Sequence, residues 1–125
     1  MTSTAELLNY AQTGNDFAKL WELAKQAAQA AAEQENARLG NENRRGFDCG
    51  FAWVHFPGNT PFAKWTKKAG LSSKHYPTGQ SIWYSKLHSV PTQSVSVHEA
   101  ACRAARDVLA HGLQSSQVYC GSRLD

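Results

Sequence analysis

A turn followed by a capped helix is the first place where this chain could bind an anion. Thr60 and Pro61 are the residue types that begin an α-helix, Thr as N-cap and Pro in the first turn. The free N–H groups and positive dipole of a helix N-terminus attract phosphate, and Gly58 would let a phosphate approach. The candidate ligand-binding residues in this segment are Asn59, Thr60, Lys64 and Lys67. The alternative is an ordinary capped helix with a solvated basic face, since the Lys-Ser/Thr signature of a P-loop is missing.

Three arginines form a second group of candidates. Arg103 and Arg106 are expected on the polar face of the last helix, and Arg123 lies in the tail. Guanidinium groups bind phosphate or carboxylate through two parallel hydrogen bonds, so all three are candidate ligand-binding residues. The alternative is that Arg103 and Arg106 pair with the neighbouring Glu99 and Asp107.

Aromatic residues are dense between residues 53 and 84, and basic residues lie among them. This pattern suits stacking on nucleic-acid bases. Trp53 and Trp65 are expected in the core. Trp83 and Tyr84 are neighbours in an expected strand and must therefore face opposite sides of the sheet. One of the two is expected to face solvent or a ligand, and Trp83 is the candidate ligand-binding residue.

Metal binding and catalysis have little support in the sequence. His98 and Cys102 have the i, i+4 spacing of metal ligands on a helix, but no recognised zinc pattern completes the set. Cys49 with His55 or His98 would supply a nucleophile and a base. A nucleophile elbow, an H-E-x-x-H motif and paired carboxylates are all missing. The sequence therefore predicts no catalytic residue, no metal and no cofactor, and leaves enzyme activity as a lesser alternative.

The first part of the chain is predicted to form a helical arm. A short helix over 4–12 precedes a longer one over 16–39, whose apolar stripe is Phe17 and Leu20 followed only by alanines, including Ala24, Ala27 and Ala31. Alanine buries little area, so this stripe suits close contact with another helix. That helix could belong to this chain or to a second copy. Self-association through the N-terminal helices is the expectation, and packing inside the chain is the alternative.

Alternating strands and helices are predicted after the arm. The segment 47–56 is apolar on both faces, which indicates a central strand covered on both sides. Ser96 and Glu99 have the spacing of a capping box at the start of the last helix. The expected elements are a strand at 47–56, a helix from Pro61 that stops at Gly70, a strand at 81–87, a helix ending at Gly112 and a strand at 117–120.

The predicted fold class is therefore α+β, in the order αα-βαβαβ. Residues 1–43 form an acidic, alanine-rich helical arm. Residues 44–125 form a basic α/β module with a small three-stranded sheet and two helices.

Charge is divided between these two parts. Residues 1–43 carry three Lys/Arg against six Asp/Glu, a formal charge of −3, whereas residues 44–125 carry ten against four, a formal charge of +6. A basic, aromatic-rich module favours an anionic partner, which is a nucleotide, a nucleic acid or an acidic protein surface. The basic surface is small for tracking along duplex DNA, and this weighs against a duplex.

The length of 125 residues is typical of one domain. No apolar run approaches the roughly 20 residues that cross a bilayer, and the first residues lack the basic and apolar regions of a signal peptide. The three cysteines are an odd number without a C-x-x-C motif, which favours reduced thiols over a disulfide framework. A cytoplasmic protein without membrane contact is expected.

Four short segments resemble a group of small bacteriophage proteins. They are Gly-Phe-Ala-Trp-Val at 50–54, Gly-Asn-Thr-Pro-Phe at 58–62, Ser-Ile-Trp-Tyr at 81–84 and Gly-Ser-Arg-Leu-Asp at 121–125. The resemblance covers about residues 46–125, without the arm. It implies expression in the cytoplasm of an infected bacterium and, because small basic phage proteins are often accessory factors, binding to a host component. It brings no known activity and so assigns no role to any residue.

Together these patterns predict an accessory protein that binds and sequesters a phosphorylated small molecule or a nucleotide, as a means to counter host defence signalling. An inhibitor that binds a host protein or nucleic-acid complex is the alternative. A small enzyme that acts on a nucleotide is the second alternative.

Overall fold

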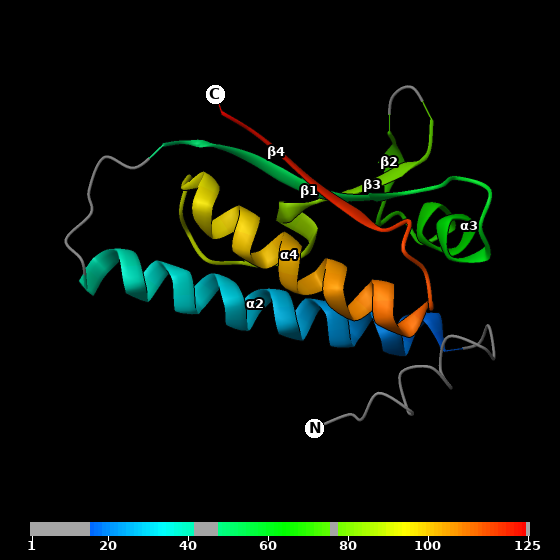
Figure 1. The fold of residues 1–125 in the computed structure, drawn as a ribbon, viewed down its shortest axis with the longest axis horizontal. Coiled ribbons are helices and arrows are strands. Elements are labelled where there is room, and N and C mark those ends of the chain that lie inside the picture. The colour runs from blue at the N-terminus through cyan, green and yellow to red at the C-terminus, as the bar shows by residue number, and fades with distance from the viewer. Residues whose placement is uncertain (1–15, 42–47, 76–77, 125) are drawn as a thin grey trace.

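The computed structural model describes residues 16–41, 48–75 and 78–124. It is an α+β fold in which a four-stranded antiparallel sheet is covered on one face by helices (Figure 1). The elements in chain order are α2 (Phe17–Asn41), β1 (Gly50–Phe56), α3 (Pro61–Lys68), β2 (Ser73–Lys74), β3 (Gln80–Trp83), the 3-10 helix η1 (Tyr84–Lys86), α4 (Val95–Gly112) and β4 (Tyr119–Leu124). The helix expected over 4–12 lies outside the described residues.

The sheet has the strand order β2-β3-β1-β4, so β1 lies inside the sheet, as predicted. The expected number of three strands is wrong. Within the segment 71–80, which carries no strand signal in the sequence, Ser73–Lys74 pairs with β3 as a fourth strand at the sheet edge. Two residues are too few to show the alternation by which a strand is recognised.

Two strand boundaries also differ from the expectation. The strand expected at 81–87 ends at Trp83, where the chain turns into η1. The strand expected at 117–120 instead spans Tyr119–Leu124 and pairs along most of β1. Gly, Ser and Arg have low or neutral strand propensity, so only the pairing with β1 explains why this segment is extended.

The described elements cover one face of β1 and leave the other open, so the expectation of cover on both sides is wrong. Ala52, Val54 and Phe56 are buried beneath the helices. The alternate residues of β1 point to the other face, where Phe51 is 36% exposed and Trp53 is half-buried. The open face is thus an aromatic surface that the helices leave uncovered.

Helix α4 lies between the sheet and α2, and it contacts β1, β4 and α2 (Figure 1). It runs antiparallel to α2, so that its last residue, Gly112, lies against Leu20 near the start of α2. A Cβ atom at Gly112 would lie 2.4 Å from Leu20 Cδ1, which explains why glycine ends α4.

The alanine stripe of α2 is buried inside the chain. Leu20, Ala24, Ala28 and Ala32 are fully buried, so the stripe continues through Ala28 and Ala32, whereas Ala27 is half-buried. One hydrophobic core contains these side chains together with those of the sheet and α4. The division of the chain at residue 43 and self-association through the arm both stay predictions.

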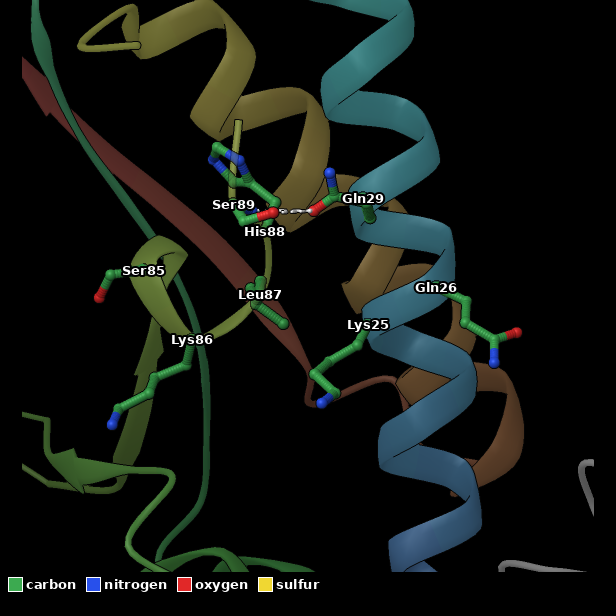
Figure 2. Close-up of a pocket in the computed structure, with 8 residues that line it drawn as sticks. All are labelled: Lys25, Gln26, Gln29, Ser85, Lys86, Leu87, His88 and Ser89. Carbon is green, nitrogen blue, oxygen red and sulfur yellow. Dashed lines mark hydrogen bonds between the residues drawn. The ribbon is translucent and has the colours of Figure 1, made fainter. Parts of the chain in front are cut away.

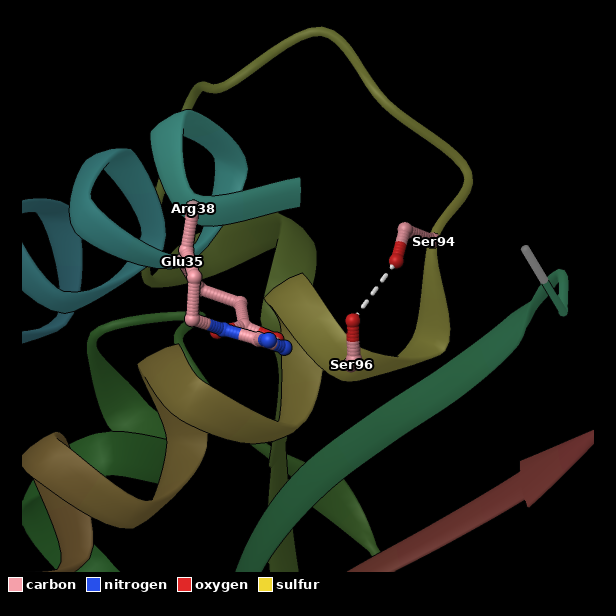
Figure 3. Close-up of polar contacts among 4 residues, drawn as sticks. All are labelled: Glu35, Arg38, Ser94 and Ser96. Atoms are coloured by element: carbon pink, nitrogen blue, oxygen red, sulfur yellow. Dashed lines mark hydrogen bonds and ion pairs between the residues drawn. The ribbon is translucent and has the colours of Figure 1, made fainter. Parts of the chain in front are cut away.

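The first turn of α4 does not form the expected capping box. The helix begins at Val95, after Ser94, and the Ser94 hydroxyl bonds to that of Ser96 at 3.0 Å instead of capping the helix. Figure 3 shows this pair where the C-terminal end of α2 faces α4, beside Glu35 and Arg38.

The Arg38 guanidinium pairs with the Glu35 carboxylate through two bonds, of 2.6 Å and 2.7 Å. A cation in the last turn of α2 also suits the negative end of that helix.

The close contact of α2 with α4 predicts that the buried alanines cannot be enlarged. Ala28→Leu is expected to lower the free energy of unfolding by about 1–3 kcal/mol, because added methyl groups in a packed core force neighbours apart. Ala30→Leu is the matched control, since Ala30 is exposed on the same helix and leucine is also a good helix former. Urea unfolding of both variants measures the difference. Equal stabilities would show that α2 does not pack on α4 through Ala28.

Candidate functional site

Exposed aromatic rings gather on the open face of the sheet. Because side chains alternate along a strand, the odd-numbered residues of β1, β3 and β4 share this face. In the described part of the chain four large hydrophobic residues are exposed, and three of them lie here: Phe51 at 36%, Trp83 at 41% and Tyr119 at 49%. Exposed rings in one patch are a common mark of a binding surface.

A groove of about 420 Å³ lies among these rings. Its lining residues are Phe51, Trp53, Trp83, Tyr84, Ser85 and Arg123. Phe51 meets Trp83 edge to face, with ring centres 6.3 Å apart, and Trp53 lies 5.2 Å from Trp83. The volume falls within the range of small-ligand sites, which is roughly 300–1,000 Å³.

The Trp53 indole lies across β4 at Gly121. A Cβ atom at Gly121 would lie 2.5 Å from Trp53 Cε2 and Cζ2, so only glycine allows the ring this position. Trp53 Nε1 is buried there without a hydrogen-bond partner among the described residues. Trp53 is therefore the floor of the groove, half-buried on the open face, and the prediction of a core position for it is wrong.

Arg123 supplies a positive charge at the groove. It pairs in register with Phe51 across β1 and β4, so both side chains lie on the open face. The Arg123 side chain is exposed, and it forms no ion pair or hydrogen bond with another described residue. Its guanidinium group is available to a phosphate or carboxylate on a ligand.

A second group of rings lies next to the groove on the same face. His55 and His75 stack with ring centres 4.1 Å apart, and Tyr119 lies 5.4 Å from His55. Ser81 Oγ holds His75 Nδ1 at 2.6 Å. Burial lowers the pKa of His55, and the adjacent His75 lowers it further, so His55 is a neutral ring at neutral pH.

The structure brings together two of the residues proposed from sequence, Trp83 and Arg123. The prediction that either Trp83 or Tyr84 faces outward is confirmed by Trp83. Phe51, Trp53, Tyr84 and Ser85 were missed as lining residues. The alternation of Phe51 and Trp53 could have identified them, had the odd face of β1 been recognised as open.

The residues proposed around Thr60 lie elsewhere, at α3. Thr60 caps this helix as predicted, because its Oγ1 accepts a hydrogen bond from Ala63 N at 3.2 Å and donates one to Pro57 O at 3.3 Å. Asn59, Lys64 and Lys67 are exposed. None of these residues lines the groove of Arg123 and Trp83.

Arg103 and Arg106 are used within the chain, which confirms the alternative considered for them. Arg103 lies 3.8 Å from the Glu99 carboxylate. Arg106 pairs with Asp107 at 2.6 Å and donates from Nε to Val118 O at 3.0 Å. The bond from Arg106 to Val118 joins α4 to the segment before β4, whereas the two ion pairs lie within α4.

A second cavity, of about 380 Å³, lies between α2 and residues 85–89 (Figure 2). Gln29 Oε1 accepts hydrogen bonds from the Ser89 amide at 2.8 Å and the Ser89 hydroxyl at 3.3 Å. Lys25 pairs with Glu22 at 3.2 Å. The contacts of Gln29 with Ser89 tie the loop after η1 to α2.

Behind the groove, Tyr84 is supported by two histidines. Its ring stacks on His98 of α4, with ring centres 3.6 Å apart. His88 Nδ1 accepts a hydrogen bond from Val90 N at 3.1 Å, so His88 Nε2 carries the proton and donates it to His98 Nδ1 at 2.9 Å. His98 then carries its own proton on Nε2, which is buried without a partner among the described residues. Burial lowers the pKa of both histidines, and His88 lowers that of His98 further, to about 4.

The described residues offer little for metal or thiol chemistry. They contain no group of three or more His, Cys, Asp or Glu side chains that could hold a metal ion. Burial raises the pKa of Cys102, and it raises that of Cys120 to about 11, so both thiols are protonated at neutral pH. His98 bonds to His88 rather than to a cysteine.

No helix in the described part of the chain is both long and apolar enough to cross a membrane. Comparisons with protein-family models, curated proteins and solved structures find no match to this chain.

The contact between Trp53 and Gly121 gives a prediction. Gly121→Ala is expected to displace the indole and to lower the free energy of unfolding by about 1–3 kcal/mol. Gly40→Ala is the matched control, since nothing lies within 4 Å of its added Cβ atom. Urea unfolding and near-ultraviolet circular dichroism measure both effects. In a Trp53→Leu background the cost of Gly121→Ala should shrink, and an unchanged cost would contradict the assigned contact.

The histidine pair predicts a loss of stability in mild acid. In the unfolded chain His98 takes up a proton near its usual pKa of about 6.5, whereas in the folded chain it stays neutral until about pH 4. The unfolded state therefore binds more protons between these values, and the free energy of unfolding falls as pH falls through this window.

Urea unfolding at a series of pH values tests this expectation. His98→Gln should flatten the dependence between about pH 6.5 and 4. His111→Gln, which removes an exposed histidine of the same helix, is the control variant. The same slope in the wild type and in His98→Gln would exclude His98 as its source.

Proposed function

We propose that the open sheet face binds a nucleotide, with the base stacked on the rings of Trp83 and Phe51 and a phosphate on Arg123. The observation that carries this proposal is the groove itself, in which these three side chains meet. Stacking of a base on an aromatic side chain contributes roughly 1–3 kcal/mol. A charge-assisted hydrogen bond from a guanidinium group adds about 1.5–3 kcal/mol.

The composition of the open face favours an anionic, planar ligand over an aliphatic one. The strand residues that share this face are Phe51, Trp53, His55, Ser73, Ser81, Trp83, Tyr119, Gly121 and Arg123. None of these is acidic, and none is aliphatic and large. Flat rings next to a guanidinium group that has no ion-pair partner among the described residues match a base joined to a phosphate.

The charge of the surrounding module supports the same ligand. Ten Lys/Arg against four Asp/Glu in residues 44–125 produce a positive field that concentrates anions near the face. Binding and release without reaction suit a face with no paired carboxylates. On this proposal the protein is an accessory factor that sequesters its ligand in the cell, and the resemblance to small phage proteins makes a host signalling nucleotide a fitting target.

Calorimetry with inorganic phosphate and a panel of mono-, di- and cyclic nucleotides tests the proposal. Trp83→Ala and Arg123→Glu should each weaken nucleotide binding at least about tenfold, because one loses the stacking surface and the other reverses the charge. The effect of Arg123→Glu should shrink at high salt, where exposed charges are screened over roughly 10 Å or less.

Two charge reversals away from the groove are the controls. Arg103→Glu alters an exposed arginine of α4, and the double variant Lys64→Glu/Lys67→Glu alters the basic face of α3. Both should bind nucleotide within about twofold of the wild type at moderate salt. If the α3 variant loses binding and Trp83→Ala does not, the ligand lies at the N-terminus of α3. Binding of no member of the panel would favour a protein partner.

A further inference from the structure

We infer that the open face binds a single-stranded oligonucleotide, with a second base position formed by His55, His75 and Tyr119 beside the groove. This inference rests on the proposed function and names the class of its ligand. It follows from the way in which the rings continue along the sheet.

The two groups of rings form one continuous surface. Neighbouring rings follow one another along the sheet. The ring centres of Trp83 and Trp53 are 5.2 Å apart, and those of Trp53 and His75 are 6.5 Å apart. The contacts continue from His75 to His55 at 4.1 Å and from His55 to Tyr119 at 5.4 Å. A ligand longer than one nucleotide would therefore meet aromatic surface beyond the groove.

The register of the strands sets the spacing of the two positions. His55 follows Trp53 by two residues in β1, and Tyr119 precedes Gly121 by two residues in β4. Two residues of a strand span about 7 Å, so the second position lies one side-chain step along the sheet from the first. Consecutive bases of an extended strand can lie on consecutive steps.

The second position has the chemistry that base stacking needs. Tyr119 is 49% exposed, so its ring is accessible to a ligand. The His55–His75 stack is nearly parallel, with 13° between the rings, and Ser81 Oγ holds His75 in place. These rings are flat surfaces, and every base has a face that can stack on such a ring.

Single-stranded nucleic acid fits this face better than a duplex does. In a duplex the bases are stacked on one another, whereas single strands can splay their bases onto aromatic side chains. The strand residues on this face include one cation, Arg123, and no acid, so an anionic backbone meets no repulsion from them.

The test compares ligands of increasing length. Thymidine and uridine monophosphates and oligonucleotides of two, four and eight residues, as DNA and as RNA, are titrated at low salt by calorimetry. The four-residue ligand should bind at least about tenfold more tightly than the mononucleotide, as expected for a second stacked base. Comparison of the DNA series with the RNA series shows which of the two single-stranded nucleic acids the face prefers. A duplex of eight pairs should compete poorly.

Variants then assign the second position. Tyr119→Ala should weaken the four-residue ligand roughly tenfold and the mononucleotide less than about twofold, whereas Tyr119→Phe should bind both like the wild type. Because Tyr119 is half exposed, its truncation should leave the fold intact, and thermal melts of the free proteins check this.

The outcomes separate this inference from the proposed function. If the mononucleotide binds in a Trp83-dependent way but affinity is the same at every length, or Tyr119→Ala changes nothing, the second position is wrong and the groove remains. If neither mononucleotides nor oligonucleotides bind, or binding ignores Trp83→Ala, the proposed function fails as well.

Discussion

The burial of α4 between the sheet and α2 is the contact on which the rest of the structure depends. Small side chains make it possible: Ala24 and Ala28 of α2 and Ala101 and Ala105 of α4 are fully buried, so the helices approach closely. Because both helices lie on the same side, the sheet keeps one covered face and one open face (Figure 1). An antiparallel sheet tolerates this arrangement, since alternate residues serve the two faces. Helix α2, on the far side of α4 from the sheet, carries three Lys/Arg against three Asp/Glu and is therefore formally neutral.

The open face gains its character from what the helices leave uncovered. Trp53 lies on the glycine of β4 at position 121, and the exposed rings of Trp83 and Phe51 meet above it. Aromatic rings that are exposed lower solubility and do not stabilise the core. Their concentration on one face is therefore typical of a binding surface. Under the proposed function Arg123 would favour anionic ligands, because no other described residue neutralises its side chain.

Local signals in the sequence predicted the local structure well. The Thr60 cap, the end of α4 at Gly112 and the interior position of β1 all follow from residue types and periodicity. The capping box expected at Ser96 and the missed strand β2 are local failures, and the other failures depend on partners distant in the sequence. The pairing of β4 through its Gly-Ser-Arg-Leu end requires β1, and apolar residues on both faces of β1 do not reveal which face the helices cover. Among the candidate site residues, Trp83 and Arg123 meet because of strand pairing. Their separation along the chain gives no indication that they are close in space.

Side chains beneath the groove fix the positions of its lining residues, and this order affects the affinity for a ligand. Tyr84 stacks on His98, and His98 is fixed by His88, so the wall of the groove is attached to α4. Gly121 fixes the floor by admitting the Trp53 indole in one position. Side chains that are already ordered lose little entropy when a ligand arrives, and each such ring saves roughly 0.5–1.5 kcal/mol of ordering cost. The neutral histidine pair therefore bears on the proposed function: the N–H of His98 has no partner among the described residues, and the Tyr84 ring that the pair positions is a wall of the groove.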